Sequence, residues 1–342
     1  MKDFYYNYVF FNSPEGNRLK RNPNGYFTIC AEDMDKDDRV IVVSQPLDTA
    51  PYFFRFLYAV HHAERINQKV RLPLKQIWFP YYFKNTFNNS KPMCFIIHCT
   101  LPFNYFKYLK KKYPNCKLVL LHRDLVKVCE KRAPGLVRNN ILDLEMTYDK
   151  GESEKFGFPW FSEFESKIDI KPAEKLESDL FFAGKVKDRL QILMDIYHRL
   201  ADAGIKCFYY LVGVPKDKQK AYPGIVYSDR FMTYREMLEH TVNTGCVLEI
   251  NQEGADGYTS RFLESVMFNK KLITNNFSVK DTKFYSDDRI NCFKKAEDID
   301  IEFVRMGSNG VDYNYDGEFS PLRMIERVDE ELIKKFGYPT SK

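Results

Sequence analysis

The sequence predicts an α/β protein of two domains, each built around a mainly parallel β-sheet. Short apolar runs alternate along most of the chain with amphipathic helical patterns, which is the order that right-handed parallel crossovers produce. Several of these runs are continuously apolar, as expected for strands buried on both faces. The chain has 342 residues, a little over twice the usual domain length of about 150 residues, so two domains are expected.

The first half contains an irregular start and then a regular alternation of strands and helices. Residues 5–11 are aromatic and apolar and predict an edge strand, whereas residues 31–38 predict an acidic turn. The later elements expected in this half are strands at 40–44, 94–99, 117–121 and 141–147, helices at 49–68 and 103–113, and an aromatic insertion at 72–83. The apolar positions of the helix at 49–68 are Phe53, Phe56, Leu57, Val60 and Ala63.

The second half repeats this alternation more regularly. The elements expected there are strands at 180–183, 207–212, 225–227, 246–250 and 271–274, with helices at 188–203, at 234–241 and after residue 259. The charged segment 162–178 is the expected linker, and residues 320–336 predict a terminal amphipathic helix. We therefore place the domains at 1–175 and 176–318, followed by a C-terminal helical segment at 319–342.

Composition places the chain among soluble globular proteins, with 44% hydrophobic and 29% charged residues. The net charge of +5 comes from scattered bases, so we expect no nucleic-acid partner. We also expect no transmembrane helix and no secretion signal. The eight cysteines form no Cys-x-x-Cys pair, which favours reduced thiols in a cytoplasmic protein. The 29 Phe and 23 Tyr belong mostly to cores, with a share expected on the surface for sugar stacking or membrane contact.

The segment 245–276 has the order strand, glycine-containing loop, helix, strand. Thr259 or Ser260 can cap the helix, and Gly257 precedes them in the loop. A helix start at the carboxyl end of a parallel strand is a natural anion site, because backbone N–H groups and the helix dipole point at the ligand. Arg261 and Glu264 lie three residues apart and share one face of the helix. This pattern suits a diphosphate followed by a ribose.

These residues resemble a motif of bacterial glycosyltransferases with the GT-B architecture, in which two Rossmann-like domains face each other. The resemblance covers about residues 179–295 and is carried by Gly257-Tyr258-Thr259-Ser260-Arg261, Glu264 and the run from Lys270 to Asn276. It implies that the loop and helix hold the diphosphate of a nucleotide sugar and that Glu264 binds the ribose. It also implies that the C-terminal helix crosses back onto the first domain.

The resemblance further implies the class of reaction. Many such enzymes build capsule, O-antigen or exopolysaccharide, so we expect transfer of a hexose from a UDP- or GDP-linked sugar to a glycan or lipid-linked glycan. No other cofactor is expected. The alternatives are a nucleotide-sugar epimerase of the same architecture and a binding protein without turnover. For the motif itself, the simplest alternative is an ordinary strand-loop-helix without a ligand site, in which Arg261 and Glu264 form a solvated pair.

A second loop follows the strand at 180–183. Gly184 permits close approach of the backbone, and Lys185 or Arg189 can meet a phosphate. A plain turn with two solvated bases is the alternative. The loop is not a G-x-G-x-x-G dinucleotide motif, and the chain has no Walker loop.

Two Asp-x-Asp patterns occur, at 35–37 and 298–300, and we expect both to be solvated loops. Because bases can neutralise the departing diphosphate, no metal is required. The catalytic base is expected on a loop that follows a strand of the first domain. The candidates are Asp48, His98, His122 and Asp124. A reaction that retains the sugar configuration needs no such base.

The run 107–113 mixes four lysines and two tyrosines with one leucine. A solvated helix end is the simpler interpretation, and contact with anionic lipid is the alternative. A lipid-linked acceptor would make that contact useful, so the protein is expected in the cytoplasm, with a peripheral position at the inner face of the membrane as an option.

Overall fold

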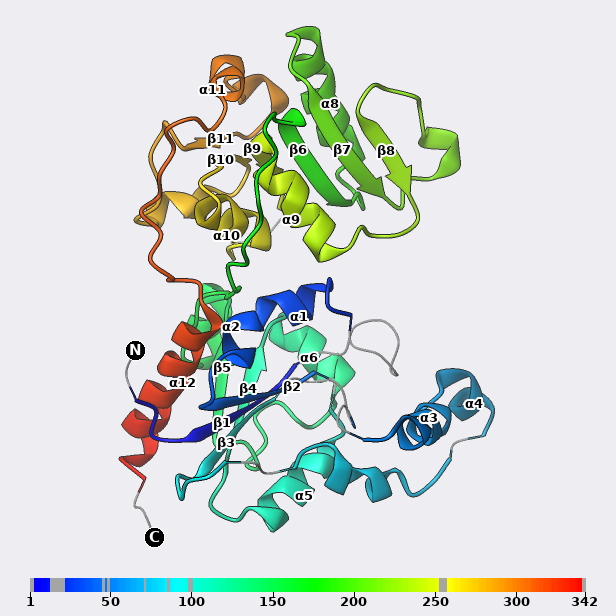
Figure 1. Ribbon diagram of the computed structural model, residues 1–342, viewed down its shortest axis with the longest axis vertical. Helices are drawn as coiled ribbons and strands as arrows, with labels where there is room; N and C mark the ends of the chain where they lie inside the picture. The colour runs from blue at the N-terminus through cyan, green and yellow to red at the C-terminus, as the bar shows by residue number, and fades with distance from the viewer. Residues whose placement is uncertain are drawn as a thin grey trace. The chain divides into compact units, whose positions relative to one another are not determined.

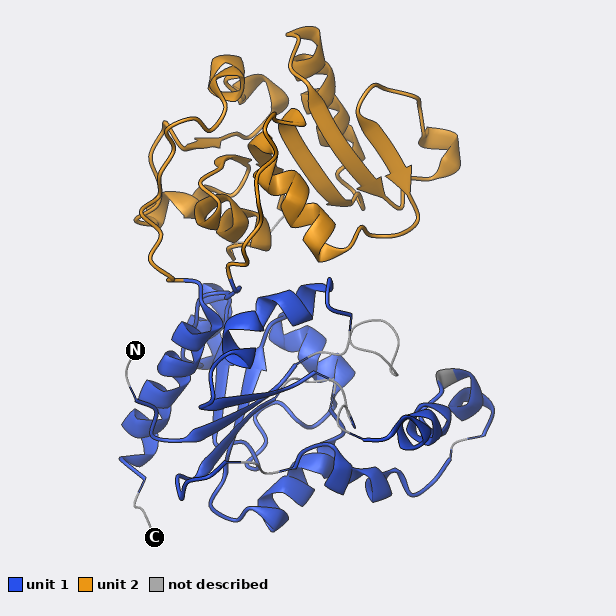
Figure 2. Cartoon of the chain, viewed as in Figure 1, with its two compact units in different colours: residues 1–166, 319–342 blue, residues 167–318 orange. Residues whose placement is uncertain are grey.

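The computed structural model describes residues 3–12, 22–44, 47, 50–70, 72–84, 87–97, 101–251 and 257–339 (Figure 1). Two compact units make up the chain (Figure 2). Unit 1 comprises residues 1–166 and 319–342, and unit 2 comprises residues 167–318. Each unit contains one sheet in which every pair of neighbouring strands is parallel.

The sheet of unit 1 has five strands in the order β2-β1-β3-β4-β5. Their bounds are β1 Asn7–Phe11, β2 Val40–Val43, β3 Met93–Ile97, β4 Lys117–His122 and β5 Leu144–Thr147. The prediction of an edge strand at 5–11 is wrong, because β1 pairs with β2 on one side and with β3 on the other. All five residues of β1 are buried, which fits an interior strand covered on both faces.

Along the chain, the helices of unit 1 lie between these strands, except for the last two, which follow β5. They are α1 Tyr26–Cys30, α2 Glu32–Asp35, α3 Tyr52–His61, α4 Glu64–Lys69, the 3₁₀ helix η1 Lys75–Tyr81, α5 Phe103–Lys112, α6 Val126–Arg132, α7 Lys150–Phe156 and α12 Pro321–Phe336. Residues 31–38 therefore include a short helix rather than only an acidic turn. The single helix expected at 49–68 is two helices, because Ala63 is extended and the Asn67 side chain donates to the carbonyls of His61 and Ala63.

The terminal helix α12 belongs to the first unit, as the resemblance implied. Its apolar face packs with the sheet in one buried cluster, to which it contributes Leu322, Met324, Ile325, Val328 and Leu332. Asp329 accepts hydrogen bonds from the hydroxyl of Tyr8 (2.6 Å) and the backbone N–H of Tyr5 (3.2 Å). The last helix in the chain thus completes the core around its first strand.

The expected linker at 162–178 is partly core. Phe164 is buried in the cluster of unit 1, as is Phe161 directly before the segment, and the Ser166 hydroxyl donates to the carbonyl of Cys30 (3.0 Å). Ser178 already belongs to the first strand of unit 2. The aromatic side chain of Phe164 inside a charged stretch accounts for this difference, because it anchors the segment to unit 1.

The sheet of unit 2 has six strands in the order β11-β10-β9-β6-β7-β8. Their bounds are β6 Ser178–Lys185, β7 Cys207–Val212, β8 Ile225–Ser228, β9 Thr244–Glu249, β10 Lys271–Thr274 and β11 Ile290–Cys292. The helices are α8 Leu190–Asp202, η2 Lys216–Lys218, α9 Tyr234–Val242, α10 Ser260–Met267, η3 Phe277–Asp281, η4 Ala296–Asp298 and α11 Ile301–Met306.

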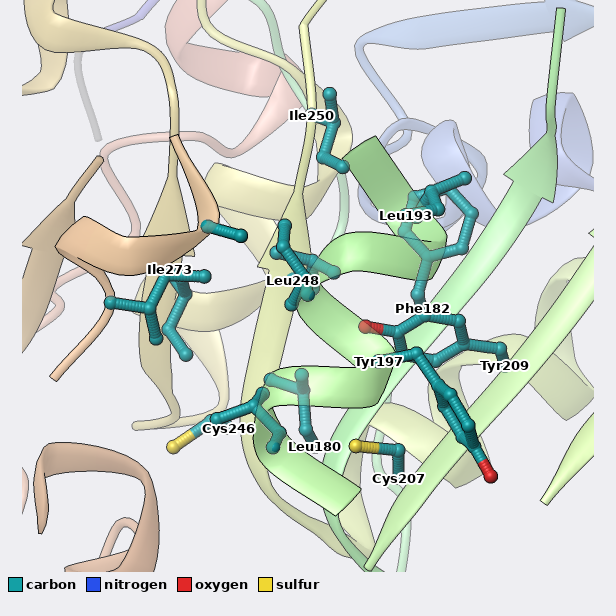
Figure 3. Close-up of a cluster of buried hydrophobic side chains, with 14 of the residues drawn as sticks. Leu180, Phe182, Leu193, Tyr197, Cys207, Tyr209, Cys246, Leu248, Ile250 and Ile273 are labelled. Atoms are coloured by element: carbon teal, nitrogen blue, oxygen red, sulfur yellow. The ribbon is translucent and has the colours of Figure 1, made fainter. Parts of the chain in front are cut away.

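One buried cluster holds unit 2 together (Figure 3). Helix α8 contributes Leu193 and Tyr197, which lie one turn apart and meet Phe182 of β6 and Tyr209 of β7. Leu248 of β9 lies in the same cluster. The spacing of the apolar residues on α8 therefore fixes this helix against the centre of the sheet.

Candidate functional site

The order of the strands in unit 2 reverses between β6 and β9. From β6 the chain continues to β7 and β8 on one side, and from β9 it continues to β10 and β11 on the other side. β6 and β9 are themselves paired neighbours. In open parallel sheets such a reversal leaves a crevice at the carboxyl ends of the two strands, which is where ligands bind. The two loops singled out in the sequence follow β6 and β9, so the fold places both at this point.

Helix α10 begins at this edge with a well-formed cap. Thr259 is the N-cap residue, and its hydroxyl oxygen accepts from the backbone N–H of Arg261 (3.2 Å). The Asn276 side chain donates to the carbonyl of Gly257 (3.2 Å) and so attaches the loop to the end of β10. Ser260 is the first helical residue, and the ring of Tyr258 lies 5.1 Å from that of Phe262. The start of a helix such as α10 presents backbone N–H groups that can hold an anion.

Glu264 is completely buried within α10. Its carboxylate accepts from the Tyr234 hydroxyl (2.8 Å) and from the Arg261 guanidinium (2.6 Å). Burial raises the pKa of Glu264, and Arg261 and Tyr234 oppose that rise. The two residues that were expected to share a helix face therefore form an ion pair, with Arg261 partly exposed and Glu264 beneath it.

Two arginines cross between the loops. Arg189, just before α8, donates to the carbonyl of Ile250 at the end of β9 and to the carbonyl of Lys185 at the end of β6. Arg261 of α10 reaches in the opposite direction, to the carbonyl of Ala183 in β6 (3.5 Å). Burial lowers the pKa of Arg189. Arg189 thus bridges the carboxyl ends of β6 and β9.

The first loop differs from its expected form. β6 continues through Gly184 and Lys185, which pair with β7, so the strand does not end at residue 183. A methyl group on Gly184 would make only ordinary contact, at 3.5 Å from the ring of Phe182. The side chain of Lys185 is exposed at the carboxyl edge. Of the three predicted residues, Lys185 therefore offers a solvent-exposed cation, whereas Arg189 is engaged with backbone carbonyls.

Three polar residues of this region were not singled out as site residues from the sequence. Glu249, the last residue of β9, is buried and accepts from the hydroxyls of Thr259 and Thr274. Burial raises its pKa. The side-chain amide of Asn275 forms two hydrogen bonds with the backbone of Asn251. It accepts from the N–H (2.6 Å) and donates to the carbonyl (3.2 Å). Tyr234 bonds to Glu264. A carboxylate inside an otherwise apolar strand was the one signal that pointed to Glu249.

The candidates for the catalytic base belong to unit 1. Asp48 and His98 lie outside the described residues. His122 ends β4 and is fully buried, with Nε2 3.0 Å from a carboxylate oxygen of Glu145 and its ring stacked on Phe158. Its Nδ1 has no hydrogen-bond partner within the described part of the chain. Asp124 is half-exposed and pairs with Arg132. In this conformation His122 is enclosed by protein, whereas a base has to reach the acceptor hydroxyl.

Both Asp-x-Asp patterns serve local backbone structure. Asp37 forms an ion pair with Arg39 (2.6 Å). Asp300 caps α11, and Asp298 accepts from the backbone N–H groups of Lys294 and Lys295. Across the described ranges, no cluster of three or more His, Cys, Asp or Glu side chains is arranged to hold a metal ion. Within the same ranges, no helix has the length and apolar character needed to cross a membrane.

Comparison with known proteins gives matches only among solved structures. No family model and no curated protein matches the chain. TarM shares 12% identity over 71% of this chain with a TM-score of 0.42, and the match covers 54% of TarM. An alpha-glucosyltransferase, solved with UDP-glucose and DNA containing an abasic site, shares 12% identity over 97% of this chain and 93% of its own, with a TM-score of 0.45.

A third similar structure is described as a UDP-N-acetylglucosamine 2-epimerase from Listeria monocytogenes. It shares 9% identity over 98% of this chain and 99% of its own, with a TM-score of 0.43. The chain thus spans about half the length of TarM and nearly the whole length of the other two. At identities of 9–12%, these similarities concern the fold alone.

Proposed function

We propose that this protein is a glycosyltransferase whose unit 2 binds a nucleoside diphosphate sugar at the reversal between β6 and β9. The observation that supports it most is the capped start of α10 at this edge, with Arg261 reaching across to β6. The first turn of a helix presents backbone N–H groups and the positive end of its dipole, which favour a phosphate. The sequence resemblance to GT-B enzymes points to the same loop.

The ion pair inside α10 suggests how the donor is held. The Arg261 guanidinium is partly exposed and sits on the buried carboxylate of Glu264. A diphosphate at the helix start would draw the guanidinium into a charge-assisted contact. Rotation of Arg261 would then free one oxygen of Glu264 for the ribose hydroxyls. The exposed Lys185 would supply a second positive charge beside the leaving diphosphate.

The proposed reaction breaks the bond between the sugar carbon and the diphosphate oxygen and joins that carbon to an acceptor hydroxyl. The diphosphate keeps the bonding electrons, which Arg261 and Lys185 would stabilise without a metal. The hydroxyl proton passes to a base of unit 1, with Asp48, His98 and Asp124 as the remaining candidates, or to the diphosphate if configuration is retained. The acceptor is a glycan or lipid-linked glycan of capsule, O-antigen or exopolysaccharide synthesis.

Calorimetric titration tests the donor site directly. UDP and GDP should bind the wild type, and Arg261→Ala should weaken the preferred diphosphate by about tenfold to a hundredfold, the loss expected for a hydrogen bond to a charged group. The bare nucleoside should bind both proteins equally, because it lacks the phosphates. Arg230→Ala, which removes an exposed arginine elsewhere in unit 2, is the matched control. Equal weakening of diphosphate and nucleoside would place the phosphate site elsewhere.

Two further measurements separate the alternative functions. Glu264→Gln should weaken the nucleoside as well as the diphosphate, because the ribose is common to both. Incubation with nucleotide sugar alone, followed by NMR, should show only slow hydrolysis of the donor by a transferase. A change of sugar configuration without an acceptor would instead identify an epimerase, and binding with no hydrolysis would identify a non-catalytic binder.

A further inference from the structure

The apolar face of α3 points to solvent rather than to the core. Phe53, Phe56, Leu57 and Val60 follow the spacing of a single helix face, and their exposed fractions are 64%, 47%, 39% and 39%. The buried residue of α3 is Tyr58, on another face. Helix α3 and its neighbour α4 extend away from the sheet of unit 1 (Figure 1). A surface helix ordinarily buries its apolar stripe, so this inverted arrangement needs an explanation.

The exposed apolar surface continues beyond α3. It includes further large side chains on α4, on η1 and on the chain between them: Ile66, Val70, Leu74, Ile77 and Tyr81. Phe54 of α3 stacks on Tyr81 of η1, with ring centroids 6.4 Å apart, so the two elements form one surface. We call the exposed apolar residues of 52–81 the apolar patch. Exposed apolar side chains gathered in one segment in this number mark an interaction site.

Aromatic contacts beneath the apolar patch hold α3 against η1. Tyr58 packs edge-on against Trp78 (5.6 Å) and Tyr82 (5.9 Å). The Trp78 indole N–H donates to Nδ1 of His61 (2.7 Å), and Nε2 of His61 lies 2.9 Å from the carbonyl of Pro73. These contacts join α3 to η1 through side chains that are buried or half-buried. The apolar side chains are therefore presented on a defined scaffold.

Positive charge is concentrated in the same segment. Residues 50–84 contain six bases and one acid, Glu64. The bases are Arg55, Arg65, Lys69, Arg71, Lys75 and Lys84. Since the chain has 52 basic and 47 acidic residues, the remainder holds 46 of each and has no net charge. The whole net charge of +5 thus equals the excess charge of the segment that carries the apolar patch, so the interpretation that it comes from scattered bases is wrong.

We propose that the apolar patch docks this protein onto an anionic lipid surface. Aromatic and aliphatic side chains enter the boundary between headgroups and acyl chains, while lysines and arginines remain at the headgroups. A second copy of the chain would bring two positive patches together, which charge repulsion opposes. Nucleic acid would suit the bases and the aromatic rings, but the aliphatic Leu57, Val60 and Ile66 offer it no stacking surface.

The lysine-rich run at 107–113 supplies charge rather than apolar contact. Helix α5 buries Tyr105, Phe106 and Leu109, and Lys110 pairs with Asp143 (2.5 Å). The ring of Tyr105 lies 5.2 Å from that of Phe79 in η1, so α5 packs against the segment of the apolar patch. The sequence therefore pointed to a lipid contact in a neighbouring helix, whereas the structure places the exposed apolar side chains on α3, α4 and η1.

Vesicle flotation tests the proposal on the full chain. The wild type should float with vesicles of phosphatidylglycerol mixed with phosphatidylcholine and much less with phosphatidylcholine alone. The double change Phe53→Ser with Leu57→Ser should abolish flotation, because it removes exposed apolar area. Arg65→Gln with Lys69→Gln should lower the partition coefficient by about fivefold per base, the factor equivalent to about 1 kcal/mol. Both variants change exposed side chains, so circular dichroism and thermal unfolding should match the wild type.

Matched changes in unit 2 control for loss of hydrophobicity and charge in general. Phe231→Ser with Met306→Ser removes side chains that are 67% and 68% exposed, and Lys216→Gln with Lys218→Gln removes two exposed bases. These variants should float as the wild type does. Equal flotation of patch and control variants would overturn the proposal, as would no flotation of the wild type. So would loss of self-association in the patch variants by light scattering, or preferential binding of an oligonucleotide over anionic vesicles.

The proposal does not rest on the nucleotide site of unit 2. Nucleotide titration should give the same affinity for the wild type and for Phe53→Ser with Leu57→Ser. A protein that binds vesicles but no nucleotide would retain this proposal and lose the proposed transferase. The converse result would retain the transferase and remove the membrane contact.

Discussion

Glu249 places a carboxylate inside a strand that is otherwise apolar and buried. Its oxygens accept from Thr259, which caps α10, and from Thr274 at the end of β10. Burial raises its pKa above the usual 4.5, although both hydroxyls and the charge of Arg261 oppose this shift. Glu249 thus ties the start of the candidate phosphate helix to the adjacent strand, and the desolvation of its charge opposes folding.

We predict a pH-dependent stability difference for Glu249→Gln. Because the folded chain binds this proton more tightly than the unfolded chain, wild-type stability falls as pH rises from about 4.5 through the raised pKa. Glutamine carries no charge, so the stability of the variant relative to the wild type should rise over the same range. Urea unfolding of both proteins from pH 4 to pH 8 measures this change. The difference in unfolding free energy should change by about 1.4 kcal/mol for each unit by which folding raises the pKa.

The exposed Glu297→Gln is the matched control for that series. A stability difference between wild type and Glu249→Gln that stays constant with pH would show that Glu249 titrates alike in the folded and unfolded chains. In that case the hydrogen bonds to its carboxylate would offset the effect of burial on its pKa.

At the scale of elements, the ends of β6 and β9 are joined by Arg189 from the residue before α8. Its guanidinium donates to the carbonyls of Lys185 and Ile250, the positions at which the two loops start. Arginine suits this place because its fixed fork of donors serves two acceptors at once. The strand reversal makes β6 and β9 neighbours, and Arg189 links their carboxyl ends.

We expect Arg189→Met to loosen this edge while keeping the apolar stem. The two carbonyls would lose a charged donor, which costs about 1–3 kcal/mol in the free energy of unfolding. Amide hydrogen exchange in the segment after β9 should quicken more than exchange in β7. Arg230→Met is the control, since that side chain is exposed on unit 2. Unchanged exchange after β9 would mean that other contacts hold the loop.

At the scale of the whole molecule, unit 1 is assembled from both ends of the chain. Residues 1–166 provide its sheet, and α12 covers one face with Ile325 and Val328, which are fully buried in the cluster that contains Tyr8. Unit 2 is continuous from 167 to 318 and has its own core. The two units should therefore differ in how they tolerate separation.

We predict that residues 167–318 unfold cooperatively on their own and keep nucleotide affinity, whereas residues 1–166 alone aggregate. Co-expression of 1–166 with 319–342 should restore soluble protein, measured by gel filtration and calorimetry. The same peptide carrying Val328→Asp should fail to do so, because it places a charge at a fully buried position. Soluble, cooperatively folded 1–166 without the peptide would contradict the prediction.

Local sequence patterns determined most elements of this protein. Apolar runs located five of the six strands of unit 2 but not the short β11. Thr259 was one of two predicted caps and is the observed cap, and the pattern at 320–336 matches α12. These features depend on residues within one or two turns, so periodicity and capping chemistry are enough to predict them. The resemblance at residues 257–264 likewise predicted a ligand site at the edge of the sheet where α10 starts.

Only the tertiary structure decided which strands and side chains are partners and which side chains are buried. It placed β1 inside the sheet, sealed Glu264 beneath Arg261 and Tyr234, enclosed His122, and left the apolar face of α3 exposed. Each outcome depends on contacts between residues far apart in the chain: Tyr234 and Glu264, for example, are 30 positions apart. A hydrophobic pattern gives the face of a helix but not what covers it, because burial is a property of the neighbours that the fold supplies.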